Sequence, residues 1–246
     1  MIIDIVKVFL PSTIAFFLGI ALTPLLTYYL YKYKMWKKRP GKMSPDGHDT
    51  PIFNELHKER EVGTPKMGGV IIWLSTLITV TGIWAVAKLF PGEITSKLDL
   101  LSRNQTWIPL ATLILGSLIG LVDDFMDVAG SASHVGRGLS LYKRIAIVAL
   151  IGLLAALWFY FKLDVTGIGI PFSGELYLGW LFVPFFVLVT LAIYSGGVID
   201  GIDGLAGGLF ATMFAAYAGI AFYQQQINLA AFSSVVTGAI LAFLWF

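Results

Sequence analysis

The sequence predicts an all-α integral membrane protein, a polytopic helical bundle of about seven spans with a small external β-hairpin. Hydrophobic residues make up 57% of the 246 residues and charged residues only 13%, and the mean hydropathy is +0.80. A soluble domain of this composition would expose a large apolar surface. The apolar runs are close to about 20 residues long, as a membrane helix requires, and they lack the alternation of a membrane β-barrel. We therefore expect a single polytopic membrane domain over residues 1–246.

The spans follow from the positions of these apolar runs. We expect them near residues 5–31, 67–90, 107–122, 145–161, 181–194, 205–223 and 229–246. The third is short, about 16 residues, because Asp123 and Asp124 interrupt it. Residues 165–180 alternate in polarity on both sides of Ser173-Gly174, which predicts the external hairpin. A proline-capped segment over 50–56 predicts a short helix at the membrane interface.

Basic residues gather in two of the loops between spans. Nine of the 17 lysines and arginines lie in residues 32–66, and three more lie in residues 123–144. Because such loops remain on the cytoplasmic side, we expect an inner (cytoplasmic) membrane protein with its amino terminus outside. The sequence contains no cysteine, which excludes disulfides and thiolate metal sites.

The rest of the chain is organised around residues 193–208, where two carboxylates lie between two apolar runs. Asp200 and Asp203 are three residues apart, so they share a face on a helix or tight turn. Glycines such as Gly201 and Gly204 let a bulky ligand approach the backbone. A glycine-rich packing motif is the plainer interpretation, but acids at the ends of spans are usually functional or paired.

The predicted topology brings Asp123, Asp124, Asp200 and Asp203 to the same membrane face, the one we assign to the cytoplasm. Oxygen ligands of this kind bind Mg²⁺, which takes one or two carboxylates together with phosphate oxygens. Four basic residues are near in topology and could neutralise the remaining phosphate charge. These are Lys66, Arg137, Lys143 and Arg144. The constellation indicates a site for polyphosphate chemistry.

Three segments carry a resemblance to a known family. They are GTPKMGG at Gly63–Gly69, GLVDDFMDV at Gly120–Val128, and VIDGIDGLAGG at Val198–Gly208. Together they resemble the polyprenyl-phosphate N-acetylhexosamine-1-phosphate transferases. Within the family, GTPKMGG, the GLSLYK run at Gly138–Lys143 and the terminal LWF are most similar to the branch whose donor carries muramoyl-pentapeptide.

The resemblance implies a Mg²⁺-dependent enzyme. It would transfer phospho-N-acetylmuramoyl-pentapeptide from a UDP carrier to undecaprenyl phosphate, releasing UMP and forming the first lipid intermediate of peptidoglycan synthesis. By the same resemblance Asp123 would deprotonate the lipid phosphate with Asp124 as its partner, Asp200 would act in catalysis, and Asp124 and Asp200 would hold the metal. The implied substrate-binding residues are Thr64, Lys66, Lys143, Gly201, Asp203 and Gly204. A homodimer is expected, and no nucleic acid.

Some positions differ from the pattern of that branch. Asp127 stands where this branch usually has lysine and is more similar to the branch that transfers N-acetylglucosamine-1-phosphate. Lys66 stands where threonine is common, and Glu61 where a basic residue is usual, which suggests a relocated charge. The chain also ends before the family's later Gly-Asp and histidine motifs, so we expect a fragment of a longer chain.

Two alternatives from other classes stay open. An ion-coupled transporter would place its acids near the bilayer midplane, in two related halves, whereas these acids are predicted at one face. A truncated and inactive membrane scaffold is the other.

Overall fold

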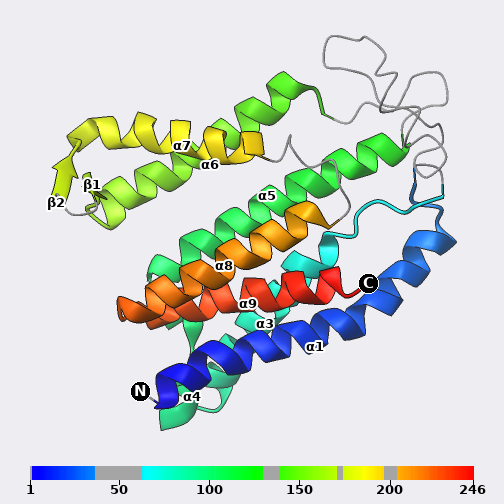
Figure 1. Ribbon diagram of the computed structural model, residues 1–246, viewed down its shortest axis with the longest axis horizontal. Helices are drawn as coiled ribbons and strands as arrows, with labels where there is room; N and C mark the ends of the chain where they lie inside the picture. Colours follow the sequence, from blue (N-terminus) through cyan, green and yellow to red (C-terminus); the bar gives the residue numbers. More distant parts are fainter. Residues whose placement is uncertain (1, 37–62, 103, 130–138, 171–173, 197–203) are drawn as a thin grey trace. The chain divides into compact units, whose positions relative to one another are not determined.

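The computed structural model describes residues 2–36, 63–102, 104–129, 139–170, 174–196 and 204–246 (Figure 1). The chain divides into two compact units, residues 1–138 with 202–246, and residues 139–201. The predicted interfacial helix at 50–56 lies outside the described residues.

The first unit consists of helices that run along one another. Its elements are α1 (Ile2–Lys32), α3 (Val70–Leu89), α4 (Glu93–Leu98), the 3-10 turn η1 (Leu100–Ser102), α5 (Asn104–Ala129), α8 (Leu205–Tyr223) and α9 (Ile227–Leu244). In α4, Lys97 donates a hydrogen bond of 2.7 Å to Glu93 and holds the pKa of that exposed carboxyl below its usual range.

The second unit is a helical pair joined by the predicted hairpin. Its elements are α6 (Leu141–Lys162), β1 (Gly167–Ile170), β2 (Gly174–Tyr177), the 3-10 turn η2 (Gly179–Leu181) and α7 (Phe182–Gly196). The strands are antiparallel, with Gly167 opposite Tyr177 and Ile170 opposite Gly174. Gly174, the first residue of β2, has a positive φ of 91°, which glycine adopts without steric cost. The hairpin prediction is confirmed.

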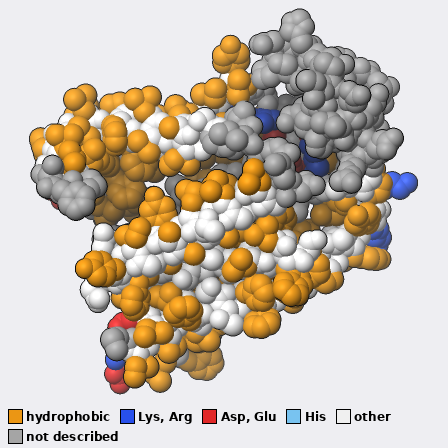
Figure 2. Space-filling model, in the orientation of Figure 1, with side chains coloured by type: hydrophobic (Ala, Val, Ile, Leu, Met, Phe, Trp, Pro, Cys, Tyr) orange, Lys and Arg blue, Asp and Glu red, His pale blue; other side chains and the backbone are white. Residues whose placement is uncertain are grey.

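Six of the described helices are long and apolar enough to cross a bilayer, so the protein is a multi-pass membrane protein. They are α1, α3, α5, α6, α8 and α9. The predicted fifth span corresponds to α7, an apolar helix of only 15 residues. Hydrophobic side chains cover much of the visible surface of these helices (Figure 2). This is the surface expected where the surrounding solvent is lipid.

One helix is longer than its predicted span. The helix α5 continues through Asp123 and Asp124 as far as Ala129, past the predicted end of the third span at residue 122. An apolar run measures where hydrophobicity stops, whereas a helix stops only where its backbone hydrogen bonds lose their partners. Aspartate has a modest helix propensity but does not break a helix. The acids therefore project from the last turns of a continuous helix.

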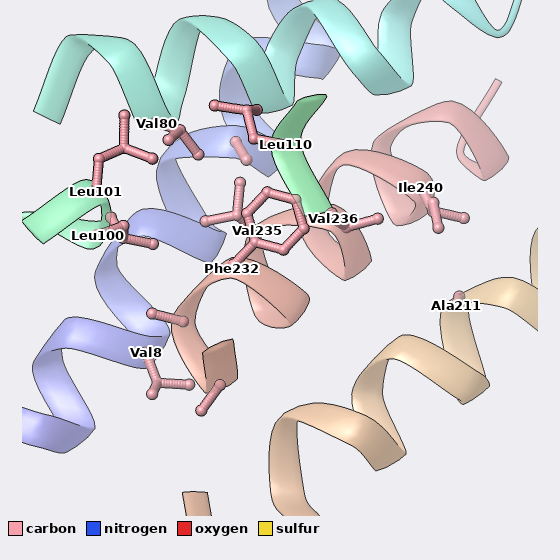
Figure 3. Packing of buried hydrophobic residues seen from close by; sticks show 13 residues of the cluster. Val8, Val80, Leu100, Leu101, Leu110, Ala211, Phe232, Val235, Val236 and Ile240 are labelled. Atoms are coloured by element: carbon pink, nitrogen blue, oxygen red, sulfur yellow. The ribbon is translucent and has the colours of Figure 1, made fainter. Parts of the chain in front are cut away.

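The core of the first unit forms around α9. Figure 3 shows Phe232, Val235 and Val236 of α9 among side chains from neighbouring elements, with Val80 of α3 and Leu110 of α5 close by. All five are at most 4% exposed. This apolar cluster fixes α9 in the first unit.

The helices α1 and α9 cross at small residues. Ser12 donates a hydrogen bond of 2.7 Å to the backbone oxygen of Ser234. A Cβ at Gly238 would overlap the backbone oxygen of Ser12, and one at Gly19 would lie 2.6 Å from the Cβ of Ala242. Small residues of this kind let membrane helices approach closely, where packing and interhelical hydrogen bonds hold them together.

Candidate functional site

The carboxyl-terminal ends of α1 and α5 meet the Gly63–Gly69 segment, which leads into α3. Leu30, Met67 and Val128 form a small buried cluster there, one residue from each of these three parts. The backbone N–H of Lys66 donates a hydrogen bond of 2.8 Å to the carbonyl oxygen of Met35, just beyond α1. The first and second sequence motifs are thereby brought together from positions about 60 residues apart along the chain.

Lys66 and Asp127 form a hydrogen-bonded ion pair that joins these two motifs. The Asp127 side chain is 10% exposed and that of Lys66 31%. Two residues that both differ from the family pattern are therefore partners. The Lys66 ammonium of the first motif therefore lies against the last turns of α5, beside the predicted catalytic acids.

Met67 holds the backbone of the first motif in an unusual conformation. Its φ is 72°, in the left-handed region that non-glycine residues rarely adopt. Met67 is 8% exposed, and its backbone N–H lies near the Asp124 carboxylate. Strained backbone of this kind persists only where the surroundings fix it, and it is concentrated at functional sites.

Three aspartates lie within five consecutive residues of α5. Asp123, Asp124 and Asp127 are each partly buried. Asp124 lies within electrostatic range of Asp123, Asp127 and the Lys66 ammonium. Asp123 also has a polar or charged interaction partner. The arrangement can hold a cation on one carboxylate while a neighbouring carboxylate accepts a proton.

The end of α9 lies beside both the first and the third motif. A Cβ at Gly68 would lie 3.0 Å from the Phe243 ring, and one at Gly207 would lie 2.7 Å from Leu244. Gly204 begins α8 with a φ of 80°, a conformation that suits glycine. The start of α8 and the Gly63–Gly69 segment therefore both contact the last residues of α9.

The predicted site residues are distributed unevenly over the described structure. Asp123, Asp124 and Lys66 come together, and Thr64 is exposed at the beginning of the same segment. Lys143 is exposed in the first turn of α6, in the second unit. The described residues do not include Asp200, Gly201 or Asp203. The predicted meeting of all four acids stays a prediction.

Sequence reasoning missed the role of Asp127 and the conformation of Met67. The signal for Asp127 was its spacing of three from Asp124, which places both on one helix face. For Met67 the sequence carries no signal, since a left-handed methionine results from tertiary packing.

The donor set suits Mg²⁺ without enclosing it. Within the described ranges no group of three or more potential ligands gathers. Magnesium usually takes only one or two carboxylates and completes its shell with water and phosphate oxygens. Asp124 can supply one such carboxylate, and the second predicted ligand, Asp200, lies outside the described residues.

The chain matches one family model and is similar to several known enzymes. Residues 106–246 match the model of glycosyl transferase family 4. The phospho-N-acetylmuramoyl-pentapeptide-transferase of Chloroflexus aggregans is 29% identical to the chain, over 99% of the chain and 61% of that relative. The enzyme of the same name from Listeria innocua is 32% identical, over 76% of the chain and 54% of the relative. The chain thus spans 54 to 61% of the length of these two relatives.

The family match begins within α5 and includes its acids, the start of α8 and the end of α9. The protein is a member of glycosyl transferase family 4.

Proposed function

We propose that the protein transfers phospho-N-acetylmuramoyl-pentapeptide from its UDP carrier to undecaprenyl phosphate. The products are UMP and the first lipid intermediate of peptidoglycan synthesis. The observation that carries the proposal is the meeting of Lys66, Asp124 and Asp127 at the ends of membrane helices. A lipid phosphate in the bilayer and a nucleotide sugar in the cytosol can react only at such a boundary. The names of the relatives support the choice of donor.

The reaction is a displacement at phosphorus. An oxygen of the lipid phosphate forms a bond to the β-phosphorus of the UDP-sugar. The bond from that phosphorus to the oxygen of the α-phosphate breaks, and UMP leaves. Asp123 accepts the proton of the lipid phosphate, which makes the phosphate a better nucleophile. Lys66 and Lys143 bind the diphosphate and offset its charge.

Asp124 and Asp200 are the residues that would hold Mg²⁺, with Asp203, Thr64, Gly201 and Gly204 lining the place of the nucleotide. When bound, the ion would neutralise part of the negative charge on the phosphate groups during the transfer. In phosphoryl transfer most of the rate enhancement comes from positioning and charge stabilisation. The required protein groups are therefore carboxylates and cations held at fixed places.

The positive-inside bias puts this site on the cytoplasmic side of the inner membrane, with the amino terminus outside. A homodimer is part of the same proposal. The orientation is supported by the sequence pattern, and the homodimer by the family resemblance.

The test is a transfer assay with the purified full-length protein. It contains Mg²⁺, undecaprenyl phosphate and UDP-N-acetylmuramoyl-pentapeptide labelled in the sugar. We expect lipid-linked label and stoichiometric release of UMP. Absence of both products from a folded, membrane-inserted protein would refute the proposal.

Two variants connect the activity to the site. Asp123→Asn and Asp200→Asn should each abolish turnover while the protein still inserts. Asp164→Asn is the matched control, because Asp164 is exposed between α6 and β1 and has a φ of 51°, which asparagine also adopts readily. Full activity in Asp123→Asn would remove that residue from the mechanism.

A second donor is worth testing beside the first. Asp127 favours the branch that transfers N-acetylglucosamine-1-phosphate, so the same assay should include UDP-N-acetylglucosamine. Label from this donor alone would assign the protein to that branch. Ion flux in vesicles that is driven by protons or sodium, with no lipid-linked label, would instead identify a transporter.

A further inference from the structure

Two consecutive residues of the Gly63–Gly69 segment lie against two carboxylates on α5. The Lys66 side chain forms an ion pair with Asp127, and the Met67 backbone N–H lies near Asp124. Asp124 and Asp127 are three residues apart and thus share one face of the helix. The segment is therefore attached to α5 by the Lys66–Asp127 pair, immediately before the residue that faces Asp124.

The two ion pairs in the described part of the chain differ in their surroundings. Glu93 and Lys97 belong to one helix and are 83% and 48% exposed. Asp127 is only 10% exposed, and its partner comes from a segment 61 residues away. Exposed pairs contribute little because water and salt screen them. Loss of one partner in a shielded pair leaves a charge without compensation.

Met67 depends on this attachment. Its left-handed backbone is unfavourable for methionine, so the residues around it have to maintain it. Packing against Leu30 and Val128 fixes the side chain, and Lys66 immediately before it is tied to Asp127. Loss of the Lys66–Asp127 pair would therefore loosen the backbone at Met67, next to Asp124.

We propose that Asp127 is a positioning residue of the transfer site. It acts through Lys66: its carboxylate holds the ammonium against α5 and so fixes the Gly63–Gly69 segment beside Asp124. The proposal rests on the proposed function and assigns a role within it to a residue that acts through its contact with Lys66. Lys66 and Asp124 then have fixed places before any substrate arrives, which is the condition for efficient phosphoryl transfer.

The test is a double-mutant cycle in the full-length protein, with Asp127→Ala, Lys66→Ala and the double variant. We expect each single change to lower kcat/KM at least about tenfold. The double variant should be within about twofold of Lys66→Ala, because residues that act as one unit are not additive. The matched cycle with Glu93→Ala and Lys97→Ala should leave kcat/KM unchanged.

Conservative variants separate positioning from packing. Asp127→Glu keeps the charge and should retain most of the activity, whereas the isosteric Asp127→Asn should resemble Asp127→Ala. Independent, multiplying losses in the cycle would overturn the positioning role, as would better activity in Asp127→Asn than in Asp127→Glu.

Thermal unfolding of the same four proteins gives a readout that needs no turnover. If the wild type is active and the losses in kcat/KM and in stability are additive, the positioning role of Asp127 is refuted and the proposed function stands. An inactive wild type refutes the proposed function and with it the positioning role, even where the stabilities of Lys66 and Asp127 variants are coupled.

Discussion

The helices α9 and α5 are similar in composition and different in surroundings. Their most apolar 18-residue windows have mean hydropathies of 2.0 and 1.7. In α9, 56% of that window is buried among the described residues, against 6% in α5. The first packs through small residues against α1, and the second carries the acids of the candidate site at its end. Hydropathy alone thus finds membrane helices without telling which of them hold the fold and which carry the chemistry.

The largest effect we expect is on activity, at α5. Asp124→Asn keeps the size of the side chain but loses the negative charge that would face the metal. We expect a loss in kcat of at least about 100-fold, as when an electrostatic contact to the reacting groups is removed. The midpoint of thermal unfolding in detergent should change little. A large drop in that midpoint would mean that Asp124 holds the fold instead, and the contrast between the two helices would fail.

The next effect is on stability, at α9. Gly238→Ala places a methyl group against the backbone oxygen of Ser12, and a backbone atom cannot move aside as a flexible side chain can. We expect destabilisation by about 1–3 kcal/mol, the usual cost of overpacking. Thermal unfolding of the purified protein measures it.

The matched control for Gly238→Ala is Gly116→Ala on α5. A Cβ at Gly116 has no neighbour within 4 Å in the described structure. The same substitution should be neutral or slightly stabilising there, because alanine favours a helix more than glycine does. Equal losses at both positions would show that α5 is packed as tightly as α9.

A smaller effect is expected for the hydrogen bond between α1 and α9. Ser12→Ala removes the bond of 2.7 Å to the Ser234 carbonyl. Interhelical hydrogen bonds in membranes contribute about 0.6 kcal/mol on average and at most about 1.7, so a loss in this range should appear in thermal unfolding. Ser195→Ala removes a bond within α7 to the carbonyl of Ala192 and should cost less. A larger cost at Ser195 would contradict the importance of the α1–α9 contact.

Sequence pattern predicted the long helices and the hairpin well because both depend on local periodicity. The expected span at 205–223 coincides with α8. The helix α5 continues seven residues past the predicted end of its span, since the pattern reports the membrane boundary rather than the end of a helix. Of the candidate site, the motifs predicted Asp123, Asp124 and Lys66, which lie near one another in the structure and whose roles stay predictions. The pairing of Lys66 with Asp127 could not be predicted, because it needs the register of two segments that meet only in the folded chain.

The smallest effect concerns the turn that leads into α9. Gln225 has a φ of 60°, whereas its neighbour Gln224 has a φ of −79°. Gln225→Gly relieves left-handed strain of about 1 kcal/mol but also frees the unfolded chain, which costs about 0.4–1 kcal/mol. The two terms nearly cancel, so thermal stability should be unchanged or slightly higher.

Gln224→Gly relieves no left-handed strain and only frees the unfolded chain, so it should lower stability by about 0.4–1 kcal/mol. The two variants have the same composition and differ only in which of two adjacent glutamines is replaced. A difference between their unfolding midpoints therefore measures the backbone strain at Gln225 directly. Equal midpoints would mean that this strain is absent, and the entry into α9 would then depend on side-chain packing alone.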